Sequence, residues 1–130
     1  KAAAKAARWQ KIADEAAKQC GRQVLMHVAD IAPLSVLLQS AELFSASDTA
    51  IVFYYEGERE QSLRTHLRGL DVRRVVLIVG AEGGFSPTEA EAVTAAGAQP
   101  VSLGRLILRA ETAALAALVV TQYELGNFDL

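Results

Sequence analysis

Residues 75–118, VVLIVGAEGGFSPTEAEAVTAAGAQPVSLGRLILRAETAALAAL, decide the fold of this chain. The segment holds two apolar stretches, and each runs into a glycine-containing turn that is followed by a helical pattern. In α/β proteins, the turns at the carboxyl ends of parallel strands form ligand pockets. We therefore expect these two turns to build a pocket, and the rest of the chain to support them.

The first turn, Gly80–Gly84, follows the apolar run Val75–Val79. An unbroken run rich in β-branched residues is typical of a strand that is buried on both faces. Three glycines around Glu82 let a ligand approach the main chain closely. The residues Ser86–Glu89 have the pattern of a capping box with proline at the first helical position, so we predict a helix that starts there and ends at Gly97.

The second turn, Leu103–Ala113, has an unusual composition for a loop. Its apolar residues 106–108 lie between Arg105 and Arg109, and Glu111 and the following threonine open an alanine-rich helix. Loops are normally polar and solvated. An apolar loop must be buried against something, and a flat aromatic ligand such as adenine is one candidate.

Upstream of these turns, helical and strand periodicities alternate. We predict helices over residues 3–19, 34–44 and 58–70, and strands over 24–28 and 50–55. This alternation indicates an α/β fold with a mostly parallel sheet and helices on both faces. In such a sheet, residues Tyr54–Gly57 would lie beside the two later turns as a third wall of the pocket. A simple alternation of the two tyrosines between core and surface is the competing interpretation.

Composition limits the class of protein. The 130 residues suit one domain, and a hydrophobic fraction of 52% without a run of transmembrane length favours a soluble, non-membrane protein. No signal-peptide pattern opens the chain, so we expect a cytoplasmic location. Cys20 is the only cysteine, so we expect no disulfide and no metal site. A net charge of -2 argues against a large nucleic-acid footprint on this chain alone.

Two motifs carry a family resemblance. I-V-G-x-E-G-G-F-S-x-x-E at residues 78–89, paired with L-G-x-x-I-L-R-x-E-T-A at residues 103–113, resembles the RsmE family, and Arg8-Trp9 and the turn Gln19–Arg22 extend the match over nearly the whole chain. Members of that family are SPOUT-class enzymes that use S-adenosylmethionine to methylate N3 of a uridine in 16S ribosomal RNA. Four residues depart from the family pattern: Ala81 stands where proline is frequent, Arg105-Leu106 replace a common Pro-Arg pair, and Ala110 stands where threonine is frequent.

The resemblance also implies architecture and partners. It implies a deep C-terminal trefoil knot of SPOUT type, which would be an exception to the rule that chains avoid knots. It further implies a homodimer that acts on 16S ribosomal RNA of the small ribosomal subunit. Residues 1–130 would then form the SPOUT methyltransferase domain, and we expect the N-terminal PUA-like RNA-binding domain of such proteins to be absent from them.

By the same resemblance, the cofactor would sit bent in the knot, with its adenine held by main-chain groups and apolar side chains. The positions to which the resemblance points are Gly80, Glu82, Gly83, Leu103, Gly104, Ile107, Leu108, Arg109, Thr112 and Ala113. Main-chain N–H and C=O groups can satisfy an adenine edge, and glycines permit that approach.

Arg109 is the first candidate for catalysis. Methylation at N3 of uracil places negative charge on the base oxygens, which an arginine can stabilise. An ion pair with Glu111 or Glu82 that only rigidifies the loop is the alternative. Glu111 is the third catalytic candidate, as a residue that orients the arginine or the backbone. Thr112 beside it is a candidate cap for the last helix.

Arg8 and Arg22 are the candidates for RNA contact. Either could reach the target base from a partner subunit, and Arg8 is the second catalytic candidate. The competing interpretations are a solvated charge for Arg8, and for Arg22 an interaction with the last carbonyl groups of the first helix.

Other functions stay open at this point. The same fold could methylate a ribose 2′-oxygen of transfer RNA, or could serve as a dimerisation module that holds cofactor or RNA without turnover. An ordinary nucleotide-binding α/β domain is the least specific alternative. The sequence does not support that alternative, because the turn lacks the G-x-G-x-x-G spacing of the Rossmann fingerprint.

Overall fold

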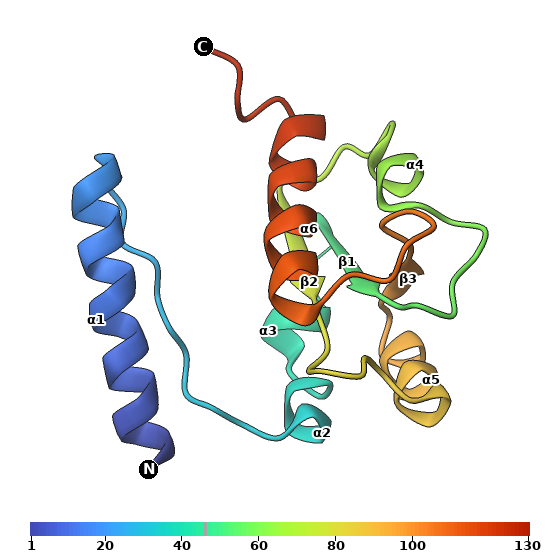
Figure 1. Cartoon of the computed structure of the whole chain (residues 1–130), viewed down its shortest axis with the longest axis horizontal. Coiled ribbons are helices and arrows are strands. Elements are labelled where there is room, and N and C mark those ends of the chain that lie inside the picture. Colours follow the sequence, from blue (N-terminus) through green and yellow to red (C-terminus); the bar gives the residue numbers. More distant parts are fainter. Residues whose placement is uncertain (46) are drawn as a thin grey trace. The chain divides into compact units, whose positions relative to one another are not determined.

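The computed structural model describes residues 1–45 and 47–130 (Figure 1). The chain forms two compact units, Lys1–Leu37 and Leu38–Leu130. The elements, in chain order, are α1 (Ala2–Cys20), α2 (Leu34–Leu37), α3 (Ala41–Phe44), β1 (Thr49–Tyr54), α4 (Leu63–Leu67), β2 (Arg74–Ile78), α5 (Pro87–Ala95), β3 (Gln99–Val101) and α6 (Ala110–Glu124). None of the described helices is both long and apolar enough to cross a bilayer.

In the first unit, α1 is the predicted N-terminal helix, and the prediction of a strand over residues 24–28 is wrong. The reason is the side chain of Gln10. Its Nε2 donates to the carbonyl of Met26 (2.7 Å), and its Oε1 accepts from the amide of Val28 (2.7 Å). The Gln10 side chain thus forms the hydrogen bonds with these main-chain groups that a neighbouring strand would otherwise form. The apolar residues Trp9 and Ile12 are exposed (42% and 61%), whereas Ala6 and Ala17 are the buried positions of α1.

Two predicted helices are shorter in the structure. The helix predicted over 34–44 is divided into α2 and α3, because Ser40 starts a new helix by accepting a hydrogen bond from the amide of Leu43 (3.4 Å). The helix predicted over 58–70 is reduced to α4. The carboxylate of Glu58 accepts from the amides of residues 60 and 61 (2.9 and 2.7 Å), which fixes a turn, and Ser62 caps α4.

The second unit contains a three-stranded parallel sheet in the order β2-β1-β3. The central strand β1 pairs Val52 with Leu77 of β2 and with Gln99 of β3. The predicted parallel α/β arrangement is therefore confirmed. Because β1 is central, its carboxyl end lies between the ends of the two strands that lead into the predicted turns.

The two faces of β1 bury different side chains, because successive residues of a strand point to opposite faces. Val52 joins a cluster with Leu63 and Leu67 of α4, Val101 of β3 and Ala117 of α6. Phe53, which is fully buried, packs edge-on against Phe85 ahead of α5, with ring centroids 5.6 Å apart. This packing fixes the strand ends on which the candidate site is built. In α4, burial lowers the pKa of His66 below its ordinary value of 6.5.

Candidate functional site at the strand ends

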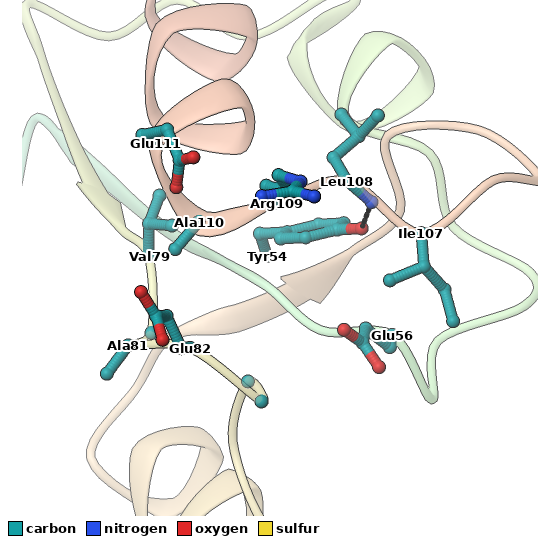
Figure 2. Close-up of a pocket in the computed structure, with 13 residues that line it drawn as sticks. Tyr54, Glu56, Val79, Ala81, Glu82, Ile107, Leu108, Arg109, Ala110 and Glu111 are labelled. Carbon is teal, nitrogen blue, oxygen red and sulfur yellow. Dashed lines mark hydrogen bonds between the residues drawn. The ribbon is translucent and has the colours of Figure 1, made fainter.

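A cavity of about 420 Å³ lies where the three strands end. Figure 2 shows the residues that line it. They come from three segments: Tyr54 and Glu56 at the end of β1, residues 79–84 after β2, and residues 107–111 at the start of α6. Of the third wall predicted over Tyr54–Gly57, Tyr54 and Glu56 line the cavity, whereas Tyr55 and Gly57 do not. The volume is within the range of about 300–1,000 Å³ that is typical of small-molecule sites.

The wall after β2 is a glycine turn followed by a fixed helix. Gly83 and Gly84 both have positive φ values, 85° and 71°, which other residues rarely adopt. The predicted capping box is present: Ser86 Oγ accepts from the amide of Glu89 (3.1 Å), and Glu89 Oε1 accepts from the amide of Ser86 (2.9 Å). With Pro87 at the start, α5 is anchored immediately after the turn. The main chain of the turn is thereby held beside the cavity.

The opposite wall is the apolar loop before α6. Leu106 and Ile107 are strongly exposed (79% and 70%), although an apolar loop was expected to be buried. The amide of Leu108 donates to the hydroxyl of Tyr54 (3.1 Å), and this bond joins the loop to the end of β1 (Figure 2). The amide of Ala113 donates to the carbonyl of Arg109 (2.7 Å) as α6 begins.

Negatively charged side chains outnumber positively charged ones in the lining of the cavity. Glu56, Glu82 and Glu111 contribute carboxylates, and among the described lining residues only Arg109 contributes a guanidinium (Figure 2). Arg109 makes no salt bridge within the described part of the chain, so neither predicted ion pair, with Glu82 or with Glu111, is formed. The lining therefore carries a surplus of negative charge, which favours a ligand with positive charge.

The structure brings most of the predicted cofactor positions to this cavity. Six of the ten predicted cofactor positions line it: Gly80, Glu82, Gly83, Ile107, Leu108 and Arg109. Glu111, predicted as a catalytic residue, lines it too. The other four predicted positions are not among the lining residues: Leu103 packs against the core cluster, Gly104 and Thr112 are exposed, and Ala113 is fully buried in α6. The prediction that Thr112 caps the last helix is wrong, because α6 starts at Ala110 and Arg109 occupies the N-cap position.

The sequence predicted Glu56 only as part of the third wall and gave no individual site role to Gly84 or Ala110, which also line the cavity. Glu56 and Gly84 are neighbours across it: a side chain at position 84 would place its Cβ 3.5 Å from the carboxylate oxygen of Glu56. The signal that could have singled out Glu56 was its position immediately after the strand predicted over residues 50–55, which is the central strand β1 in the structure.

Arg8 and Arg22 belong to the other unit. Both are exposed. Arg22 Nε donates to the carbonyl of Val24 (2.6 Å), so its side chain does not cap α1. Its main-chain amide closes the helix by donating to the carbonyl of Ala17 (2.9 Å). No cluster of three or more potential metal-ligating side chains occurs among residues 1–45 and 47–130.

Fold and cavity together define an α/β domain with a cavity at the carboxyl ends of its parallel strands. Residues 1–122 match the family described as RNA methyltransferase domain, and the chain belongs to this family. The proteins to which it is similar make the assignment more specific.

A ribosomal RNA small subunit methyltransferase E of Synechocystis is 39% identical over 112 residues, covering 85% of this chain and 36% of that protein. The namesake from Bacillus subtilis is 36% identical over 128 residues, covering 95% of this chain and 49% of that protein. The chain thus spans less than half the length of either relative.

Solved structures agree with this assignment. The crystal structure of ribosomal RNA small subunit methyltransferase E from Neisseria gonorrhoeae, bound to S-adenosyl methionine, superposes with a TM-score of 0.81 at 34% identity. The match covers 94% of this chain and 48% of that one. A methyltransferase from Legionella pneumophila, also in complex with S-adenosyl methionine, superposes with a TM-score of 0.77 at 30% identity.

Proposed function

We propose that residues 1–130 form the catalytic domain of an enzyme that transfers a methyl group from S-adenosylmethionine to N3 of a specific uridine in 16S ribosomal RNA. The observation that carries this proposal is the cavity at the strand ends. It combines the two motif turns, a volume suited to a small molecule, and an excess of carboxylates over guanidinium groups. The names of the related enzymes and the S-adenosyl methionine bound to the Neisseria gonorrhoeae enzyme support methylation of small-subunit ribosomal RNA with this cofactor.

The residues present fit this cofactor chemically. Exposed main chain in the glycine turn can hydrogen-bond an adenine edge, and Ile107 offers an apolar surface to its ring. The sulfonium and ammonium groups of S-adenosylmethionine are cationic, which suits the carboxylates of Glu56, Glu82 and Glu111. Gly80 and Gly83 are the proposed sites of close approach. Leu103, Gly104, Thr112 and Ala113 support the lining segments from outside the cavity.

When bound, S-adenosylmethionine supplies an electrophilic methyl group. N3 of uracil must lose its proton for the new C–N bond to form, and negative charge then spreads over O2 and O4. The guanidinium of Arg109, free of any salt bridge within the described chain, can stabilise that charge. No histidine lines the cavity, so the available proton acceptors on its walls are the carboxylates, and Glu111 is the nearest to Arg109 in sequence.

The wider architecture is part of the proposal. We propose that the sheet carries helices on both faces, that the loop before α6 belongs to a deep trefoil knot, and that the active enzyme is a cytoplasmic homodimer. Arg8 or Arg22 would then reach RNA from a partner subunit. The exposed Leu115, Leu118 and Val119 of α6 offer an apolar surface for such a contact.

The direct test is a methylation assay on purified small ribosomal subunits, with nucleoside analysis of the product by mass spectrometry. We expect N3-methyluridine, and we expect an Arg109→Ala variant to lose most of the activity. A ribose 2′-O-methylated product would favour the other SPOUT activity. Cofactor binding without any methylated product, by this chain and by a full-length relative of it, would favour the non-catalytic module.

A further inference from the structure

The loop that carries Arg109 has few hydrogen bonds to the rest of the unit. Ser102 Oγ bonds both the amide and the carbonyl of Gly104 (3.0 and 2.9 Å), but these contacts are local to the start of the loop. Among the described residues, the segment 105–110 makes one hydrogen bond to a residue distant in sequence: the amide of Leu108 donates to Tyr54 Oη at 3.1 Å.

Tyr54 is well suited to hold a loop in place. It is the last residue of the central strand, paired with Val101 of β3, so its main chain is fixed on the sheet. Its side chain lines both the cavity and a small apolar void that it shares with Leu77 and Leu103. That void has a volume of about 10 Å³, so Tyr54 is closely packed on the side that faces the core.

We propose that Tyr54 is a positioning residue, whose hydroxyl fixes the segment 105–110 at the cavity and thereby sets the place of Arg109. This inference rests on the proposed function and adds a residue that lies outside both sequence motifs. Leu108 and Arg109 are adjacent, so a bond at the amide of Leu108 restrains the backbone that carries the guanidinium. A restrained loop loses less conformational entropy when a ligand binds.

The bond has a second consequence. The Leu108 amide already donates its hydrogen bond to the Tyr54 hydroxyl, so a ligand that binds while this bond is intact cannot accept from that amide. A positioning role and a competing role for Tyr54 therefore predict opposite results. Removing the hydroxyl weakens ligand binding if Tyr54 positions the loop. It strengthens binding if the ligand needs the Leu108 amide for itself.

The test compares the wild type with Tyr54→Phe, which keeps the packed ring and removes only the hydroxyl. Tyr55→Phe is the matched control, because Tyr55 does not line the cavity. Amide hydrogen exchange in the ligand-free proteins measures the loop directly, and calorimetric titration with S-adenosylmethionine measures its effect on binding. Urea unfolding shows whether global stability has changed.

For Tyr54→Phe we expect about 3- to 10-fold faster exchange over residues 105–110 and a Kd increased by a similar factor, the scale of one lost hydrogen bond. The urea midpoint of Tyr54→Phe should stay close to that of Tyr55→Phe. If the Tyr54 hydroxyl only stabilised the fold, the midpoint of Tyr54→Phe would be the lower of the two. Unchanged exchange, or an unchanged or lower Kd, would overturn the inference. If the wild type binds no cofactor, the proposed function fails, while the exchange data still decide whether Tyr54 holds the loop.

Discussion

Leu63→Ala should destabilise the second unit, because it truncates a fully buried side chain of the core cluster. Leu63 is 1% exposed and packs with Val52, Leu67, Val101 and Ala117, so it joins α4 to the sheet and to α6. The change removes three carbon atoms, which corresponds to about 2.4 kcal/mol at about 0.8 kcal/mol for each buried group. The empty space left behind adds to this loss, so we expect the free energy of unfolding to fall by about 3 kcal/mol.

Urea unfolding followed by far-ultraviolet circular dichroism measures this change. With a slope of about 2 kcal/mol per molar urea, the midpoint should fall by about 1.5 M. Leu25→Ala is the control, because Leu25 is 54% exposed and lies outside the cluster, and its effect should stay within about 0.5 kcal/mol. Equal shifts for the two variants would refute the view that this cluster supports the strand ends.

Three further predictions concern other parts of the chain. Ser86→Ala removes one arm of the capping box and should lower the free energy of unfolding by about 1 kcal/mol in urea denaturation, whereas Thr88→Ala should change it little. Because burial lowers the pKa of His66, the unfolded chain binds more protons just below pH 6.5. Stability should therefore fall as the pH drops below 6.5, and His66→Gln should reduce that dependence; an identical pH profile in the variant would contradict this assignment. Gln10→Ala should speed amide exchange at Val28, whereas Gln19→Ala should leave it unchanged; protection retained in Gln10→Ala would show that the Gln10 side chain does not hold this segment.

The parallel sheet could be predicted because its signals are local. Apolar runs such as Val75–Val79 and the capping box at Ser86–Glu89 depend on residues close together in the chain. Parallel pairing then follows from the alternation of elements, and the meeting of strand ends at one cavity follows from parallel pairing. Local sequence signals are therefore enough to predict which segments form the walls of the site.

The errors arose where a side chain competes with regular structure. Gln10 pairs with the main chain of Met26 and Val28, a contact between residues 16 and 18 positions apart that strand propensity does not include. Ser40 and Glu58 interrupt helical patterns by bonding to nearby amides. The hydrogen bond from Leu108 to Tyr54 spans 54 residues, so it becomes visible only once the fold brings the two segments together.

The central claim is that the cavity at the strand ends binds S-adenosylmethionine, and calorimetric titration of this chain tests it most directly. Ala110→Phe should fill the cavity, since Ala110 lines it, whereas Ala114→Phe places the same ring on an exposed part of α6. We predict saturable binding of one ligand per chain in the wild type and in Ala114→Phe, and binding weakened more than about tenfold in Ala110→Phe. Absence of binding by the folded wild type, or equal binding by both variants, would contradict the account.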